Sequence, residues 1–201
     1  VEEGEGIELE SSGITIPLGK ENLAWRAAEL FLEKSTLKLR INIFIKKQIP
    51  LGAGLGGGSS NAAAVLIGLN RITGALSEDD LFKIAPTIGA DVAFFIRSHT
   101  ATMEGVGERI NGLRDFPTFH YVILCPNIHT STQEVYKKWD ELHNSAPNEP
   151  YDSQDDFKDI VPKFIDNKLD PPLKNDLEEA AFDLHPEIRA FEEILTALVL
   201  K

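Results

Sequence analysis

The chain has 201 residues, 42% hydrophobic and 26% charged, and a formal net charge of −12 at pH 7. These values are ordinary for a globular protein, and the acidic balance excludes the basic surface that nucleic-acid binding needs. Because no run of about 18 apolar residues occurs, a membrane-spanning helix is not expected either. We therefore expect no nucleic-acid or membrane partner, and the sequence leaves the oligomeric state open. The single cysteine fits a reducing, cytoplasmic setting.

The N-terminal residues 1–4 are acidic and lack the basic start and apolar stretch of a signal peptide. We expect the sequence to begin inside a longer protein. Cys125 is the only cysteine, so neither a disulfide within these residues nor a thiolate zinc site is expected. It follows the apolar run 121–124, which predicts a buried position at the end of a strand.

The first elements are indicated by polar and apolar periodicity. Residues 6–16 alternate weakly and predict strands, and residues 22–31 have helical periodicity with Asn22 as the N-cap. The clearest strand covers 37–45, where apolar residues occupy the odd positions and only Phe44 breaks the alternation. This period of two predicts one buried and one solvated face.

Helix signals follow in the middle of the chain. Residues 61–70 predict a helix that ends near Gly74. Residues 77–80 resemble a capping box, which predicts a helix through Ala85. Pro86 is expected to interrupt this helix because proline has no N–H to donate.

The second half mixes short strands and helices. Strands are predicted at 94–96, 100–104, 109–113 and 120–124, with a turn at 105–107, and helices at 132–142 and 175–200, the last broken near Pro186. The polar segment 144–156 contains two prolines and several acids and is the expected domain boundary. Because strands and helices are mixed without a regular alternation, the pattern predicts an α+β fold.

A glycine-rich loop, Pro50 to Ser60, lies between the strand 37–45 and the helix 61–70. Five of seven consecutive positions in it are glycine, which is costly to order and indicates close approach of another group to the backbone. The first N–H groups of a helix lack partners and lie at its positive end, so phosphate is the natural ligand. Ser59 and Ser60 are candidates for further hydroxyl bonds or for holding magnesium. A flexible linker is the alternative, which the flanking strand and helix oppose.

Two other phosphate-binding motifs fit less well. Residues 52–57 match G-x-G-x-x-G, but the first strand of a dinucleotide-binding fold is apolar on both faces, whereas 37–45 is half polar. No acidic residue stands at 70–76, where the ribose-binding acid is expected. A Walker A loop needs lysine before the serine, and Gly58 stands there. The loop is therefore predicted to be a phosphate loop of a third kind.

The loop resembles a motif of a known family. Residues 50–63 are similar to the second motif of GHMP kinases, P-x-x-x-G-L-G-S-S-x-A, and their longer form G-L-G-G-G-S-S-N-A-A resembles the branch that acts on diphosphocytidyl-methylerythritol. Residues 89–95 resemble the family's G-A-D-V-P-F-F, with Ala93 in place of the proline, and 105–108 resemble its next turn. The resemblance covers nearly the whole chain and is strongest between residues 47 and 108.

The resemblance implies a two-lobed GHMP kinase fold. Residues 1–150 would form an N-terminal ATP-binding domain, like domain 2 of ribosomal protein S5 but without its first strands. Residues 151–201 would begin an incomplete α/β C-terminal domain. The family's K-x-N-L lysine segment, its D-G-Y-H element and its third motif, G-T-G-x-x-x-F, do not occur in this sequence. We expect them to lie outside the printed residues.

The resemblance also implies ATP with Mg²⁺ and a small-molecule substrate. The expected reaction is phosphorylation of the 2-hydroxyl of 4-diphosphocytidyl-2-C-methyl-D-erythritol, in the non-mevalonate route to isoprenoid precursors. A homoserine or mevalonate kinase of the same fold is one alternative, and a non-catalytic nucleotide-binding protein is another. Asp91 would bind the substrate and accept the proton of its hydroxyl, and Thr132 and Tyr136 would bind the cytidine end. The expected nucleotide-binding residues are Pro50, Gly52, Gly54, Leu55, Gly56, Gly57, Gly58, Ser59, Ser60, Asn61, Asn22 and Lys47.

Without the resemblance, simpler interpretations apply to the single residues. Asn22 would be a helix cap, Lys47 a solvated charge at a strand end, Asp91 a turn aspartate and Tyr136 a packing residue of its helix. No pair among the five histidines has the spacing of helical metal ligands. No histidine is therefore assigned as a metal ligand.

Overall fold

The computed structural model describes residues 1–97, 100–105, 107, 109–113, 116, 118, 120–126, 128, 130–143 and 175–199, with side chains to residue 195. The chain divides into two compact units, residues 1–115 and residues 116–201. The predicted domain boundary at 144–156 lies outside the described residues.

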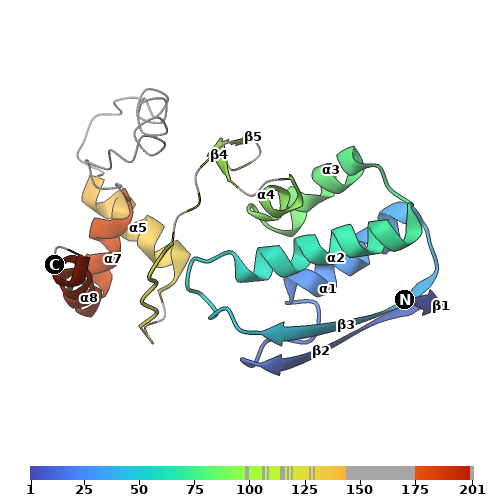
Figure 1. Ribbon diagram of the computed structural model, residues 1–201, viewed down its shortest axis with the longest axis horizontal. Coiled ribbons are helices and arrows are strands. Elements are labelled where there is room, and N and C mark those ends of the chain that lie inside the picture. The colour runs from blue at the N-terminus through green and yellow to red at the C-terminus, as the bar shows by residue number, and fades with distance from the viewer. Residues whose placement is uncertain are drawn as a thin grey trace. The chain divides into compact units, whose positions relative to one another are not determined.

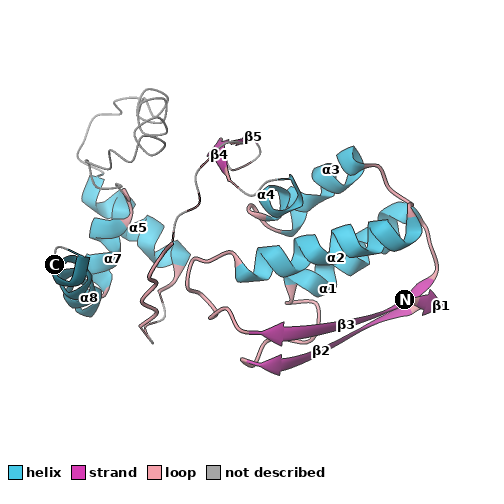
Figure 2. Ribbon diagram, in the orientation of Figure 1, coloured by secondary structure: helices cyan, strands magenta, loops and turns pink. Residues whose placement is uncertain are grey.

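A small mixed sheet forms one side of the first unit. Its strands are β1 (Glu2–Glu3), β2 (Gly6–Gly13) and β3 (Leu39–Lys47), in the order β1-β3-β2 (Figures 1 and 2). Strand β3 pairs antiparallel with β1 and parallel with β2. Ile41 and Ile45 of β3 are buried, while Phe44 is 66% exposed. The predicted strand with one buried face is confirmed.

Two long helices cover this sheet. Helix α1 (Leu23–Ser35) begins after Asn22, the predicted cap, and helix α2 (Gly57–Thr73) ends at Gly74, also as predicted. Helix α2 begins four residues earlier than expected, so the last glycines of the loop are helical. Phe31 of α1, Leu66 of α2 and Ile41 of β3 are fully or almost fully buried and belong to one apolar core.

Helices α3 (Glu78–Ile88) and α4 (Val92–Arg97) lie on the far side of α1 and α2 from the sheet (Figure 1). Two predictions are wrong here. Pro86 does not interrupt α3, because only one backbone bond is lost so near the end and Gly89 N–H still donates to the Ala85 carbonyl over 3.3 Å. Residues 94–96 are helical rather than a strand, since a short apolar run does not distinguish the two structures.

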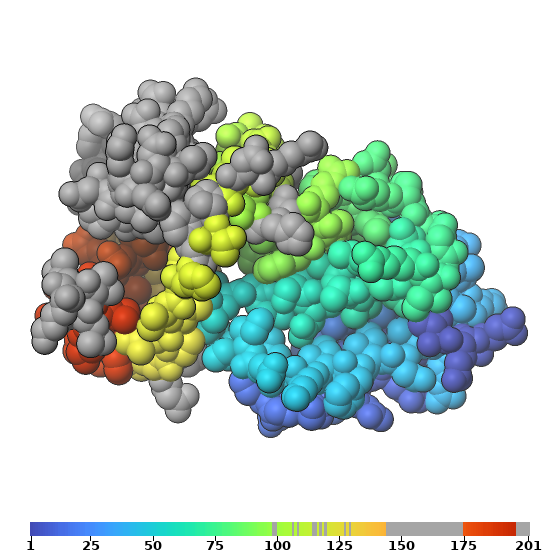
Figure 3. All heavy atoms as spheres, viewed as in Figure 1, coloured from blue at the N-terminus to red at the C-terminus, as the bar shows by residue number. Residues whose placement is uncertain are grey.

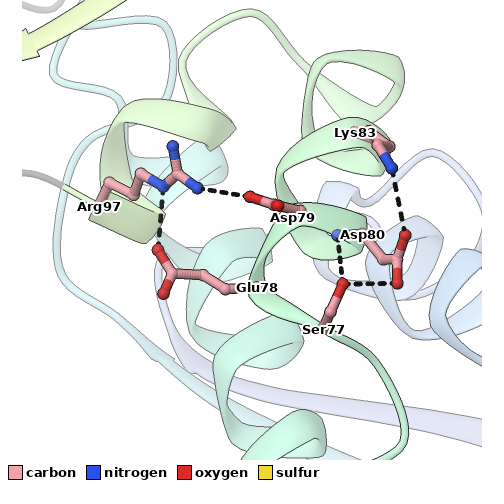
Figure 4. Close-up of polar contacts among 6 residues, drawn as sticks. All are labelled: Ser77, Glu78, Asp79, Asp80, Lys83 and Arg97. Atoms are coloured by element: carbon pink, nitrogen blue, oxygen red, sulfur yellow. Dashed lines mark hydrogen bonds and ion pairs between the residues drawn. The ribbon is translucent and has the colours of Figure 1, made fainter.

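The side chain of Arg97 connects the end of α4 to the first turn of α3 (Figure 4). Its Nε is 2.9 Å from a carboxylate oxygen of Glu78, and one terminal nitrogen is 3.0 Å from Asp79. The guanidinium also lies over the ring of Phe82, 4.1 Å from its centre. In the same turn the Ser77 hydroxyl accepts from the Asp80 N–H and donates to the Asp80 carboxylate, which forms the predicted cap. The arginine thus holds the two short helices together.

The first unit ends in a hairpin of β4 (Ala101–Glu104) and β5 (Arg109–Gly112), as predicted. In Figure 3, α2 and α3 form part of the visible surface of this unit. Over its described residues the unit therefore combines a three-stranded sheet, four helices and a hairpin, which confirms the α+β class.

The second unit is helical where it is described. It contains α5 (Thr132–His143), α7 (Glu178–Leu184) and α8 (Pro186–Val199), so the predicted helices and the break at Pro186 are confirmed. Val135 of α5 and Ala180 of α7 are buried, and Lys138 and Asp183 form an ion pair of 3.0 Å. None of the helices described in either unit has the length and apolar character to cross a membrane.

The predicted strand at 120–124 is wrong. Residues 120–126 have no regular secondary structure, and the apolar side chains from Tyr121 to Leu124 are exposed. Cys125 is exposed as well, against the prediction of a buried thiol. Strand propensity describes how a residue fits into a sheet, so it does not by itself place a segment in one.

Candidate active site

The glycine-rich loop connects the end of β3 to the start of α2, and its backbone turns sharply. Gly52, Gly54 and Gly56 have φ angles of 67°, 68° and 62°, a left-handed conformation that other residues adopt at a cost. Gly56 is the N-cap of α2 but offers no side-chain hydrogen bond to the helix. The first N–H groups of α2 therefore have no side-chain cap, and they are the groups that an anion would bind.

Two glycines at the start of α2 are needed because side chains approach them closely. A Cβ atom at Gly56 would lie 2.7 Å from the ring of Phe95. A Cβ atom at Gly57 would lie 2.8 Å from Nζ of Lys47 and 2.9 Å from a methyl carbon of Ile49. The loop is thus packed against the end of β3 on one side and against α4 on the other.

Lys47 is buried, with only 5% of its surface exposed. Burial lowers the pKa of its ammonium group, because less water solvates the charge. The prediction from the residues alone, a solvated strand-end charge, is therefore wrong. The signal was present in the sequence: Lys47 continues the odd-numbered positions of β3, and these face the helices.

The serines after the loop lie in the first turns of α2. Ser59 is buried, and a Cβ atom at Gly89 would lie 3.7 Å from its hydroxyl oxygen. The Ser60 hydroxyl donates to the Gly57 carbonyl over 3.1 Å. Ser59 is therefore close to the turn that carries Asp91, and the Ser60 oxygen can still accept a bond. Asn61 is partly buried in the same helix.

Asp91 precedes α4 in a turn closed by a 3.1 Å bond from the Val92 N–H to the Gly89 carbonyl. Its side chain is exposed. The buried residues are the two that follow it, Val92 and Ala93. An exposed carboxylate at this position is accessible to a substrate hydroxyl.

Leu23 was not predicted as a site residue, yet it lies at the centre of this arrangement. Its methyl group would be 3.4 Å from a Cβ atom at Gly58 and 3.6 Å from one at Gly89. It therefore packs the start of α1 against both the start of α2 and the Asp91 turn. No motif in the sequence marks this contact, which results from tertiary packing.

Asn22 caps α1, and both ends of its side-chain amide are in use. Its Oδ1 accepts from the Ala24 N–H over 2.9 Å, and its Nδ2 donates to the Pro17 carbonyl over 2.8 Å. The helix-cap interpretation of Asn22 is confirmed. Its expected contact with the nucleotide stays a prediction.

The structure brings Asn22, Lys47, the loop and Asp91 into the first unit, whereas Thr132 and Tyr136 belong to the second. Both of these residues are exposed on α5, four positions apart and hence on one face of the helix. Tyr136 is 54% exposed, while its neighbour Val135 is the buried residue of α5. The packing of α5 against its neighbours therefore does not explain why a tyrosine stands at position 136.

Comparison with known proteins identifies the family to which the chain is similar. Residues 22–99 match the model of the GHMP kinases N terminal domain. The 4-diphosphocytidyl-2-C-methyl-D-erythritol kinase of Citrifermentans bemidjiense is 37% identical over 193 residues, which are 94% of this chain and 65% of that protein. The kinase of the same name from Persephonella marina is 36% identical and aligns with 100% of this chain and 72% of its own.

A solved structure is similar over the same range. The crystal structure of a 4-(cytidine 5′-diphospho)-2C-methyl-D-erythritol kinase matches 97% of this chain and 67% of its own, with a TM-score of 0.72 and 35% sequence identity. The chain thus spans about two thirds of the length of the relatives it matches. On these matches, the chain belongs to the GHMP kinase family and is related within it to the 4-diphosphocytidyl-2-C-methyl-D-erythritol kinases.

Proposed function

We propose that this protein transfers a phosphoryl group from ATP to the 2-hydroxyl of 4-diphosphocytidyl-2-C-methyl-D-erythritol. The observation that carries the proposal is the uncapped start of α2 beside a buried lysine, because this combination is suited to the phosphates of a nucleotide. The names of the relatives support the choice of acceptor.

The nucleotide, when bound, supplies the phosphoryl group. The N–H groups at the start of α2 would hold its phosphates, and the close packing of Gly56 and Gly57 keeps these donors in place. Mg²⁺ binds to kinases largely through phosphate oxygens with few protein ligands. The hydroxyls of Ser59 and Ser60 are our candidates for such ligands.

Asp91 would take the proton of the acceptor hydroxyl. The carboxylate is exposed at the end of a short turn, and the turn is close to Ser59 of the phosphate site. A carboxylate is a sufficient base for a hydroxyl whose proton leaves as the phosphoryl group arrives. Thr132 and Tyr136 would bind the cytidine end, where an exposed tyrosine ring can stack on a flat base.

The test is ADP release by the protein purified at full length, with ATP, magnesium and the diphosphocytidyl substrate. Homoserine and mevalonate serve as competing acceptors. We expect turnover of the cytidyl substrate alone, and a loss of about 10²- to 10⁴-fold in kcat for Asp91→Asn with unchanged ATP binding. Glu33→Gln, which removes an exposed charge from α1, is the matched control.

Each contrary result has a definite meaning. Turnover of homoserine or mevalonate instead would contradict the proposed cytidyl acceptor but would leave the proposed kinase activity standing. ATP binding without phosphorylation of any alcohol would contradict the proposed kinase activity. An Asp91→Asn variant as fast as the parent would remove Asp91 from the mechanism.

A further inference from the structure

The ring of Phe95 lies against the residue that caps α2. A Cβ atom at Gly56 would be 2.7 Å from Cζ and 2.8 Å from Cε2 of this ring, so the ring occupies the space where other residues carry a side chain. Gly56 has a left-handed φ of 62° and no side chain with which to bond the helix. Its carbonyl accepts the Ser60 N–H over 2.8 Å, which begins the hydrogen bonding of α2. Contact with the ring therefore limits where the first turn of α2 can lie.

The backbone of Phe95 belongs to the short helix that follows Asp91. Its N–H donates to the Asp91 carbonyl over 3.4 Å, so Phe95 stands one helical turn beyond the candidate base. The next two residues after Asp91, Val92 and Ala93, are buried in the core of the unit. Asp91 and Phe95 are thus joined by a single anchored turn, and a shift of one shifts the other.

The orientation of the Phe95 ring is set by neighbours other than Gly56. The ring of Phe94 meets it edge to face, with centroids 5.1 Å apart and planes at 76°. Phe95 is also partly buried and packs against the core cluster that includes Leu66 of α2. The ring is therefore held in place independently of the cap that it contacts.

The segment that carries Asp91 meets the phosphate site on both sides of this residue. Before it, a Cβ atom at Gly89 would lie 3.6 Å from Leu23 and 3.7 Å from the Ser59 hydroxyl. After it, the Phe95 ring meets Gly56. One contact alone would allow the segment to pivot, whereas two contacts fix the distance from the carboxylate to the start of α2.

We propose that Phe95 is a positioning residue for phosphoryl transfer, because its ring sets the distance between the phosphate site at the start of α2 and the carboxylate of Asp91. The inference rests on the proposed kinase function and adds a residue that acts through its contacts with Gly56 and Asp91. Phosphoryl transfer depends mostly on the placement of the reacting groups. A displacement of about 1 Å can reduce the rate by about 100-fold.

The experiment measures kcat, both KM values and ATP affinity for the full-length protein and its variants, with folding checked by circular dichroism. Phe95→Leu removes the far edge of the ring, which is the part that meets Gly56, and Phe95→Ala is a second truncation if leucine does not fold. Phe95→Met is the conservative variant, since its unbranched chain can reach the same place. Phe82→Leu is the matched control, because Phe82 of α3 is partly buried against the same core.

We expect the truncations of Phe95 to lower kcat by about 10- to 100-fold while ATP affinity stays within about threefold of the parent. Phe95→Met keeps most of the parent rate, and Phe82→Leu keeps the parent kcat even where it lowers stability. A parent-like kcat in the folded truncations overturns the inference. An equal fall in kcat for Phe82→Leu overturns it too, because it would show a general loosening of the core.

A double-variant comparison with Asp91→Asn separates positioning from packing. If Phe95 acts by placing the base, its ring has little left to contribute once the base is gone. We therefore expect Phe95→Leu to reduce the residual rate of the Asp91→Asn protein by less than about threefold, since residues that act as a unit are not additive. A further loss as large as the one in the parent contradicts the inference.

The two proposals fail in different ways. If the parent phosphorylates the cytidyl substrate and the folded Phe95 variants share its kcat, the inference falls and the proposed kinase activity stands. If the parent phosphorylates no alcohol, the kinase activity fails first and the inference falls with it. Turnover of homoserine or mevalonate that depends on Phe95 in the expected way supports the inference and contradicts only the proposed acceptor.

Discussion

The ammonium of Lys47 lies in a buried position where loss of solvent lowers its pKa below the ordinary 10.5. The folded protein therefore binds fewer protons than the unfolded chain between the lowered pKa and 10.5. It follows that the free energy of unfolding rises with pH through this window. Below the window the full cost of burying the charge is present.

Lys47→Met should therefore stabilise the protein at pH 7, by up to about 1 kcal/mol, because an apolar side chain replaces a charge that burial disfavours. The gain should shrink as the pH rises through the lowered pKa. Thermal unfolding of parent and variant at neutral and alkaline pH checks both statements, and Lys46→Met gives the baseline. A less stable Lys47→Met protein would mean that the ammonium has a partner in the fold.

Two glycines of α2 provide a second comparison at this scale. Both Gly57 and Gly68 are helical, but a Cβ atom at Gly68 would have no neighbour within 4 Å, whereas one at Gly57 would collide with Lys47 and Ile49. Gly68→Ala should stabilise the protein by about 0.5–1 kcal/mol, the helix propensity of alanine. Gly57→Ala should lose this gain and weaken ATP binding. Equal effects of the two substitutions would show that the start of α2 has room to adjust.

At the scale of helices and strands, the contact of Arg97 with α3 can be tested directly. Arg97→Ala removes two ion pairs and the contact with the Phe82 ring, and since the side chain is 40% exposed the expected loss is only about 0.5–1 kcal/mol. The part due to the ion pairs should shrink at high salt. Chemical denaturation at two salt concentrations measures it. Lys83→Ala, which removes a longer pair of 3.5 Å to Asp80, should have a smaller effect.

The elements that were predicted correctly are those with long or capped patterns. Strand β3 has nine residues and alternates over most of them, and α1, α2 and α3 carry recognisable caps at Asn22, Gly74 and Ser77. The errors at 94–96 and 120–124 concern short apolar runs, whose structure depends on what they pack against. A cap or an alternating strand can be read from consecutive residues. The structure of a six-residue apolar run also depends on the residues that pack against it, and these lie elsewhere in the sequence.

The candidate site divides in the same way. The glycine-rich loop was predictable because its chemistry is contained in consecutive residues. The exposure of Asp91 and the central contact of Leu23 were not, because both depend on how α1, α2 and α4 pack. Lys47 is intermediate: extending the alternation of β3 by one more odd position would have placed it on the buried face.

At the scale of the whole molecule, the residues expected to bind the two substrates belong to different units. The phosphate loop is in the first unit, and Tyr136 is in the second. Tyr136→Ala should therefore raise KM for the cytidyl substrate by up to about tenfold, the loss of one aromatic stacking contact, without changing ATP affinity. Tyr136→Phe should keep most of the affinity, and Lys137→Ala serves as a neighbouring control. Steady-state kinetics with each substrate varied in turn decides the matter, and an unchanged KM would remove Tyr136 from the substrate site.

The start of α2 has a consequence for how the protein and its ligand depend on each other. Most helices complete their first turn with a side-chain oxygen of their own, but Gly56 has none to offer. A phosphate bound there would occupy the place of that missing oxygen, so the ligand would serve as a piece of local secondary structure. The stabilisation that accompanies nucleotide binding would then be concentrated in one turn of one helix, and this turn would be less firmly held whenever the protein is empty.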